Sequence, residues 1–368
     1  MKAIILKKIK YNMFNITRFG KNVIDIEKLL LILGVVLIHS DFSTDFDDIS
    51  YIGEIVMLWG SKCVAGCCVP IFFMLSGFLF FKNVESFSAT VYFSKLRSRV
   101  RSLLIPYLIW NMLAAALFIF KVKLLGFDGY DVIVDDCIRF VPFLRGFWDL
   151  NNGYPYDFAF WFIRRLMIFV VLSPVSWLIA VNRWIIFVLF AVLMVFNVDM
   201  YGLEYFALGA VFARHNLILH RYSGTVVLML FLIVTVFMLS VMNIEWIIGR
   251  IVLIRNMLGA LLLLSCSRSI SRYGLLSGKI GKSIVNSTFM IYGIHSLYST
   301  VVRKVLAEMI GVRSALGCLA TYFFTWCVLV VSSWLIFLVL RRLMPNVLSV
   351  LTGGRIKYRH NFLSTDAI

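Results

Sequence analysis

Three ionisable side chains share one face of the first apolar segment. Asp25, Lys28 and His39 flank the ten apolar residues 29–38, a run that is too short to cross a bilayer, because a spanning helix needs roughly 20 residues. At about 100° per residue, His39 lies about 20° from Lys28 and about 40° from Asp25 around a helix. Charged groups within a membrane usually face a bundle interior or a watery cavity. The spacing therefore predicts either a polar stripe facing a cavity or charges that end the helix at the headgroups.

The composition is that of a membrane protein with several spans. Hydrophobic residues make up 61% of the 368 residues, charged residues make up 15%, and the mean hydropathy is +0.92, whereas soluble domains are about 45 to 50% apolar. The net charge of +17 resides in short basic segments between apolar runs, which is typical of topology signals and contacts with lipid headgroups. The sequence contains no basic soluble domain with interleaved aromatic residues, so no nucleic acid binding is expected.

Apolar runs near the length that spans a bilayer recur along the chain. They predict an all-α, polytopic membrane helix bundle with about ten transmembrane helices. Basic clusters at the N-terminus, between alternate runs and in the tail place both termini in the cytoplasm, although the basic residues of 302–315 go against this trend. The predicted spans are 23–42, 62–81, 102–120, 158–180, 184–198, 201–213, 224–243, 245–265, 283–301 and 316–340.

Outside the spans, the sequence offers few binding motifs. The longest predicted outer segment, 121–157, is rich in acidic and aromatic residues, which suits sugar hydroxyls and ring faces but also suits a merely solvated loop. The seven cysteines form no metal-ligand pattern, so no metal site is predicted. Gly353 and Gly354 lie outside a strand-to-helix context and predict no phosphate loop.

Six stretches, in order, resemble those of acyltransferase family 3. The first is the Asp-x-x-Lys pattern of Asp25 and Lys28, followed after ten residues by His39. The others are VPIFFMLSGFLFF at 69–81, RVRSLLIPYLIWN at 99–111, WFIRRLMIFVVLSPV at 161–175, YFALGAVFARHN at 205–216 and STFMIYGIH at 287–295. No single motif is decisive, and the order of the six carries the resemblance.

The resemblance implies an integral membrane enzyme that acylates cell-envelope molecules. The expected reaction moves an acyl group, most simply acetyl, from acyl-coenzyme A to a hydroxyl of a surface polysaccharide or another envelope glycoconjugate. No bound cofactor is expected, since acyl-coenzyme A is a co-substrate. The expected location is the cytoplasmic membrane of a bacterium. The expected organisation is a basic cytoplasmic N-terminal segment, an acyltransferase-like transmembrane domain and a basic cytoplasmic tail, at 1–21, 22–340 and 341–368.

The first predicted span carries the expected catalytic group. His39 is the best candidate base, because imidazole titrates near neutrality and the family places a functional histidine here; the alternative role is that of a transient acyl carrier. Asp25 and Lys28 lie about 16 Å or more from His39 along the helix. They can pair with each other or hold a distant part of a long donor.

Arginines at the start of the third and fourth predicted spans are the candidate donor-binding residues. The family's Arg-x-x-Arg pattern suits the phosphates of coenzyme A, because guanidinium groups bind phosphate bidentately. Here the spacing departs from that pattern, because the arginines are at positions 97, 99 and 101. Instead of binding the donor, these arginines could serve only to keep this end of the span on the cytoplasmic side, by the positive-inside rule. In the fourth span we expect Arg164 to face the cavity and Arg165 to reach the headgroups. The predicted donor-binding residues are Arg97, Arg99, Arg101 and Arg164.

Residues on the acceptor side are predicted from the later motifs. His295 follows an apolar run with Tyr292 one turn before it, and Trp161 opens the fourth predicted span. These three side chains could hydrogen-bond the acceptor, although a hydrogen-bonded structural histidine is the commoner case for a buried imidazole.

A transporter or flippase for an envelope lipid or sugar is the main alternative function, because charged residues inside a helix bundle can also line a path along which a substrate crosses the membrane. The two halves of the sequence show no internal repeat, which argues against it. The sequence leaves the oligomeric state open.

Overall fold

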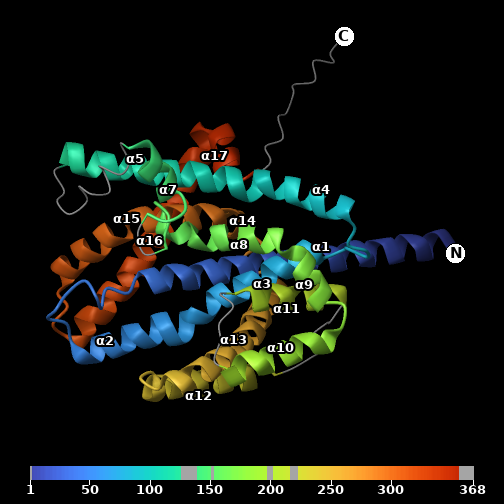
Figure 1. Cartoon of the computed structure of the whole chain (residues 1–368), viewed down its shortest axis with the longest axis horizontal. Helices are drawn as coiled ribbons and strands as arrows, with labels where there is room; N and C mark the ends of the chain where they lie inside the picture. Colours follow the sequence, from blue (N-terminus) through green and yellow to red (C-terminus); the bar gives the residue numbers. More distant parts are fainter. Residues whose placement is uncertain (1, 126–138, 151–152, 197–201, 216–222, 356–368) are drawn as a thin grey trace, which may run out of the picture.

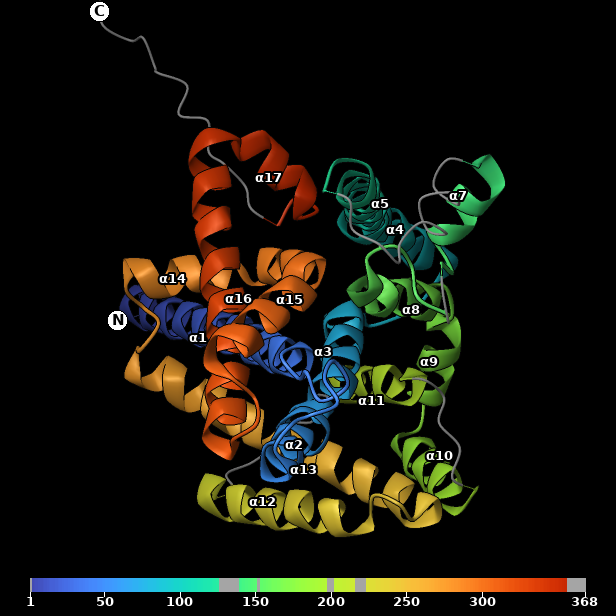
Figure 2. The ribbon, with the colours of Figure 1, turned by 90° about the vertical axis from the view of Figure 1, so that its left-hand side faces the viewer.

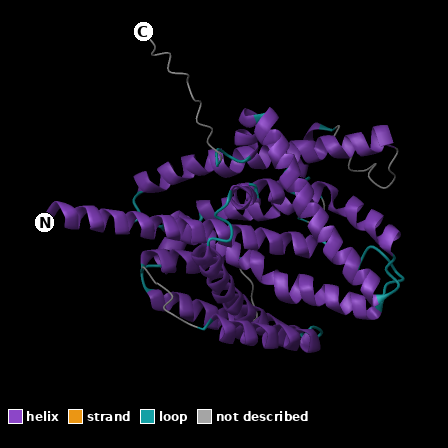
Figure 3. Cartoon of the chain, turned by 180° about the vertical axis from the view of Figure 1, so that it is seen from behind, coloured by secondary structure: helices purple, strands orange, loops and turns teal. Residues whose placement is uncertain are grey.

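A computed structural model of the chain describes residues 2–125, 139–150, 153–196, 202–215 and 223–355. Helices make up these residues almost throughout, with no strand among them (Figure 3), so the predicted all-α class is confirmed. The ranges beyond the described residues include parts of the predicted spans 184–198 and 201–213, of the segment 121–157 and of the tail 341–368.

Figure 1 labels the helices of the described residues. They are α1 (Lys2–His39), α2 (Tyr51–Leu58), α3 (Cys68–Phe81), α4 (Ala89–Arg99), α5 (Ile105–Leu125), α7 (Phe140–Gly146), α8 (Trp161–Val171), α9 (Ser173–Ile179), α10 (Arg183–Phe196), α11 (Leu203–Arg214), α12 (Gly224–Val241), α13 (Glu245–Tyr273), α14 (Lys279–Asn286), α15 (Thr288–Ile310), α16 (Ala315–Leu343) and α17 (Pro345–Leu351).

Among the described residues, five continuous helical segments are long and apolar enough to cross a membrane, and a sixth is the pair α8 and α9, which is bent by 67°. The five segments are Tyr51–Phe81, Ala89–Lys123, Gly224–Val241, Ile247–Tyr273 and Ala315–Leu343. α1 is not among them, because Asp25, Glu27 and Lys28 interrupt its apolar stretch. A multi-pass helical membrane protein is thus supported, whereas the count of about ten spans and the cytoplasmic termini remain predictions.

Two of these segments contain a π-helical turn, at Trp59–Val64 and at Val100–Leu104. A π-helical turn inserts one residue into the helical repeat and rotates the side chains that follow it. In the second segment, this turn comes directly after Arg99. The faces of these two segments therefore differ from those of a regular α-helix.

The bundle is packed around α1 (Figures 1 and 2). α1 contacts α3, α13, α15 and α16, and Leu31 and Val36 on it are fully buried. α3 and α11 pack in close contact, so that a Cβ atom at Gly77 would lie 2.0 Å from the Phe206 carbonyl oxygen. α1 is therefore in contact with helices from both halves of the chain.

Candidate active site

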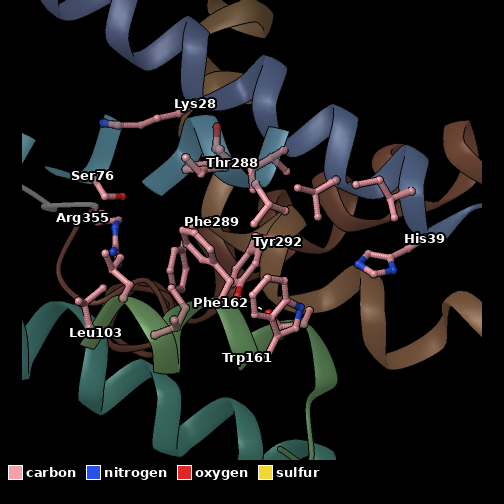
Figure 4. A pocket seen from close by; sticks show the side chains of 18 of the residues that line it. Lys28, His39, Ser76, Leu103, Trp161, Phe162, Thr288, Phe289, Tyr292 and Arg355 are labelled. Atoms are coloured by element: carbon pink, nitrogen blue, oxygen red, sulfur yellow. Dashed lines mark hydrogen bonds between the residues drawn. The ribbon is translucent and has the colours of Figure 1, made fainter. Parts of the chain in front are cut away.

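A single cavity of about 820 Å³ runs along α1 between α3, α8 and α15 (Figure 4). Asp25, Lys28 and His39 all line it, as their helical spacing predicts. Lys28 and His39 are eleven positions apart in one continuous helix, which is about 16 Å along the axis. The cavity is within the size range of small-molecule sites, about 300 to 1,000 Å³, and it joins two chemically different ends.

The basic end of the cavity is formed by Lys21, Lys28, Arg99 and Arg355. Lys28 Nζ lies 3.1 Å from Asp25 Oδ1 in an ion pair. Arg99 lies with its Cζ 5.7 Å from the ring centroid of Phe80. Among the residues that the structure describes, neither Arg99 nor Arg355 forms an ion pair with a carboxylate. This end therefore carries excess positive charge.

The middle of the cavity is aromatic (Figure 4). Phe72 and Phe162 approach to 5.5 Å between ring centroids, and Phe289 and Tyr292 to 5.9 Å. The Tyr292 hydroxyl donates to the Ala159 carbonyl oxygen at 2.7 Å, so its polar atom is used within the protein. An aromatic passage of this kind suits an uncharged, flexible chain and excludes bulk water.

At the other end of the cavity, called the histidine end, His39 lines the cavity and a second imidazole, that of His295, is buried next to it. The ring centroid of His39 lies 5.2 Å from that of His295 and 4.8 Å from that of Phe158. Nδ1 of His295 lies 3.0 Å from the Ile291 carbonyl oxygen, and because a carbonyl only accepts, the proton must be on Nδ1. Nε2 of His295 is then an acceptor, and this buried atom has no hydrogen-bond partner among the described residues.

A buried carboxyl group, that of Asp157, contacts the helix that carries His295. Oδ1 of Asp157 accepts a hydrogen bond from the hydroxyl of Ser296, the neighbour of His295, at 2.7 Å. The Asp157 backbone N–H donates to Asn111 Oδ1 at 3.0 Å. Asp157 lies just before the bent pair α8 and α9, and burial raises the pKa of its carboxyl group to about 7. The group thus links the start of α8 to the helix that carries His295.

An arginine fixes the C-terminal end of α1. Nη1 of Arg303 donates to the carbonyl oxygens of His39, at 3.2 Å, and Asp41, at 3.1 Å. Its Nε lies 2.9 Å from Asp45 Oδ2. Asp41 also accepts from the Ser61 hydroxyl at 2.5 Å. One guanidinium group on α15 therefore holds the end of α1 and the loop that follows it. One of the carbonyl groups that it binds belongs to His39 itself.

The predicted donor-binding arginines are placed differently from one another. Arg99 lines the cavity, whereas Arg97 and Arg101 are exposed and do not line it. Arg164 is buried and donates to the carbonyl oxygens of Trp148 and Gly153, so it holds the segment before α8 and is not among the cavity-lining residues. The Cζ of Arg165 lies 4.8 Å from the Trp161 ring centroid.

The predicted acceptor-side residues lie close together. Tyr292 and Trp161 line the cavity, and the ring centroids of Tyr292 and His295 are 6.3 Å apart. His295 is fully buried behind His39 and is not itself a lining residue. Tyr154, from the predicted outer segment 121–157, also lines the cavity.

Three residues of the site were not singled out from the sequence as site residues. The sequence did mark the position of Arg303 as unusual, because it is one of the basic residues in 302–315 that go against the positive-inside trend. Asp157 resembled the other acidic residues of its segment, and Arg355 resembled the other basic residues of the tail. Their places depend on contacts with helices far away in the sequence.

Comparisons with known proteins identify the family. A search of curated proteins and a search of solved structures returned no match. A family model described as an acyltransferase domain, that of acyltransferase family 3, matches residues 22–342, which includes most of the helices that enclose the cavity. The chain therefore belongs to acyltransferase family 3, and it is a membrane acyltransferase that transfers groups other than amino-acyl groups.

Proposed function

We propose that the protein is an O-acyltransferase that moves an acyl group, most simply acetyl, from acyl-coenzyme A to a hydroxyl of a surface polysaccharide or another envelope glycoconjugate. The proposed location is the cytoplasmic membrane of a bacterium, with the basic end of the cavity toward the cytoplasm. The observation that supports this function best is that one cavity is lined by Arg99 at one end and by His39 at the other.

The cavity suits the parts of an acyl-coenzyme A molecule. Its phosphates would lie at the basic end, where Arg99 can offer a guanidinium group that no carboxylate neutralises among the described residues. The uncharged, flexible part of acyl-coenzyme A would cross the aromatic middle of the cavity. The thioester would then reach His39, about 16 Å from Lys28 along α1. Asp25 and Lys28 would line the mouth, and Arg97 and Arg101 would not contact the donor.

In the simpler of two routes, His39 acts as a general base. Its imidazole takes the proton of the acceptor hydroxyl while the hydroxyl oxygen bonds to the thioester carbonyl carbon. The C–S bond then breaks, and the proton passes from the imidazolium ion to the departing thiolate. Trp161 would contact the acceptor, and Nε2 of His295, which is buried and does not line the cavity, would accept a hydrogen bond from the acceptor once the side chains around it move.

In the second route, His39 is a transient acyl carrier. A nitrogen of His39 bonds to the thioester carbonyl carbon, the C–S bond breaks, and the thiolate leaves. The acceptor hydroxyl then bonds to the same carbonyl carbon while Nε2 of His295 takes its proton. The bond between His39 and the acyl group breaks, which releases the ester, and the proton passes from His295 to the thiolate. Incubation with labelled acetyl-coenzyme A without acceptor distinguishes the routes. Label attached to the protein and lost on addition of acceptor supports the carrier, and an unlabelled protein that still transfers acetyl supports the base.

The reaction itself is tested with purified protein, labelled acetyl-coenzyme A and an extract of the cell envelope. Label that enters a glycan fraction and depends on the protein supports the proposal. If the protein in vesicles instead moves an envelope lipid or sugar across the membrane without any labelling, a transporter or flippase replaces it. No transfer from acetyl-, succinyl- or longer acyl-coenzyme A would remove the proposed activity.

A further inference from the structure

We propose that Arg355, which lies beyond the part of the chain matched by the family model, binds the phosphates of the donor together with Arg99. The inference rests on the proposed function, because it names a further residue of the same donor site. The family match ends at residue 342, and α17 and the turn after it follow. The cavity nevertheless includes Thr352 and Arg355 in its lining.

α17 is fixed to the bundle and does not extend away from it. The indole N–H of Trp110 on α5 donates to the Leu351 carbonyl oxygen at 3.1 Å. Leu348 is fully buried, Leu351 is 7% exposed, and the hydroxyl of Thr352 donates to the Leu348 carbonyl oxygen at 2.8 Å. Short helices are marginal in isolation, so these tertiary contacts hold α17 in place. The residues that follow are thereby delivered to the basic end of the cavity.

Two glycines turn the chain toward the cavity. Gly353 and Gly354 have φ angles of 64° and 72°, which residues with a Cβ atom rarely adopt. Gly353 also lies against the third predicted span, where a Cβ atom would be 2.8 Å from the Ser102 carbonyl oxygen. The glycine pair thus permits a reversal that a regular continuation of α17 would not give, and Arg355 follows directly.

The side chain of Arg355 is held in place (Figure 4). Its Cζ lies 4.2 Å from the ring centroid of Phe289, and Nη1 donates to the Thr352 carbonyl oxygen at 2.7 Å. Arg355 is exposed as a residue, so its guanidinium group, which is protonated at neutral pH, is accessible to a ligand. Stacking on an aromatic ring leaves the edge of a guanidinium group available for hydrogen bonds.

Arg99 and Arg355 reach the same end of the cavity from segments far apart in the sequence. Like charges repel, and among the described residues no carboxylate is paired with either one. A bound polyanion would remove this repulsion and would accept hydrogen bonds from both guanidinium groups. The phosphates of coenzyme A provide that charge, so the pair constitutes a two-sided phosphate clamp.

The test is the affinity of the purified full chain for coenzyme A, measured by calorimetry. We expect Arg355→Gln to weaken binding about tenfold or more, as for the loss of a hydrogen bond to a charged group. Arg355→Lys should be intermediate, because it keeps the charge and loses the planar fork. Arg341→Gln is the matched control, since Arg341 is an exposed basic residue outside the cavity lining, and it should bind like the wild type.

Salt dependence provides a readout that a purely structural role would not change. The wild type should lose affinity for coenzyme A with rising salt more steeply than Arg355→Gln, because one charge contact is absent in the variant. Should Arg355→Gln fail to fold, the affinity and salt dependence of Arg355→Lys decide. Unchanged binding by a folded Arg355→Gln, or by Arg355→Lys in that case, overturns this inference and leaves the proposed function intact. A wild type that does not bind coenzyme A overturns both.

Discussion

His39 and His295 lie with their rings 5.2 Å apart between centroids and tilted by 33°, although His39 ends α1 and His295 lies in α15. Nδ1 of His295 is committed to the Ile291 carbonyl oxygen. His295 therefore has a fixed tautomer, with Nε2 as an acceptor nitrogen. His39 lines the cavity that leads to the basic end. An acceptor hydroxyl in the cavity would meet His39 as the base, and movement of the surrounding side chains would bring it to the buried Nε2 of His295.

We expect His39→Ala to abolish acyl transfer while the protein still folds and inserts. The imidazole takes or carries the transferred groups in both proposed routes, and general base catalysis contributes about 10² to 10⁴ in rate. The measurement is label transfer from acetyl-coenzyme A, with size-exclusion behaviour and thermal stability as the folding control. Full activity in a well-folded His39→Ala would remove His39 from the mechanism.

His295→Asn should lower kcat by about 10- to 100-fold, the range for one hydrogen bond to a charged or reacting group. Asparagine can still donate to the Ile291 carbonyl, but it has no atom at the position of Nε2. The KM for acetyl-coenzyme A should change little, because His295 is distant from the basic end. His215→Asn is the matched control, since His215 also contacts a carbonyl, that of Ala180 at 3.0 Å, and does not line the cavity. Equal effects of the two substitutions would indicate a structural role only.

Arg303→Gln should lower both kcat and thermal stability. Arg303 holds the carbonyls of His39 and Asp41 and pairs with Asp45, with side chains 16% and 15% exposed. Arg313→Gln is a matched control, because its pair with Asp48 is 86% and 78% exposed and exposed ion pairs contribute little. We expect a reduction of about tenfold in kcat for Arg303→Gln alone. Donor affinity should be unchanged, and an equally small effect of both substitutions would contradict a positioning role.

The pH dependence of stability should change in Asp157→Asn. Burial raises the pKa of Asp157 from about 3.8 to about 7, so the folded protein keeps a proton that the unfolded chain has released between these values. The group therefore stabilises the fold at low pH, and this contribution is lost as the pH rises toward about 7. The unfolding temperature of the wild type should fall more steeply over this range than that of Asp157→Asn. Parallel curves would show that Asp157 does not titrate in this way.

Gly77→Ala should destabilise the bundle. A Cβ atom there would lie 2.0 Å from the Phe206 carbonyl oxygen, so α3 and α11 would have to separate, and overpacking of this kind typically costs about 1 to 3 kcal/mol. Gly20→Ala is the control, because its Cβ atom would meet nothing within 4 Å. Denaturation of the purified proteins measures the difference. Equal stability of the two variants would mean that the helix contact can relax.

The amino-acid sequence by itself determined the all-helical class, the membrane character and the polar face of α1. The long apolar runs indicate a helical membrane protein. The helical period places Asp25, Lys28 and His39 on one face of α1, whatever other helices surround that face. The order of the motifs also gave the family, which the family model confirms. These properties depend on local composition and spacing, which a sequence contains directly.

Only the tertiary structure decided which charged residues share the cavity. Of the arginines at 97, 99 and 101, a single one lines it, and a π-helical turn begins directly after Arg99. Arg355 reaches the cavity because α17 packs on α5 and two glycines reverse the chain. His295 meets His39 because α15 packs on α1. Spacing fixes the face of a residue on its own helix, but the packing of distant helices decides what that face meets.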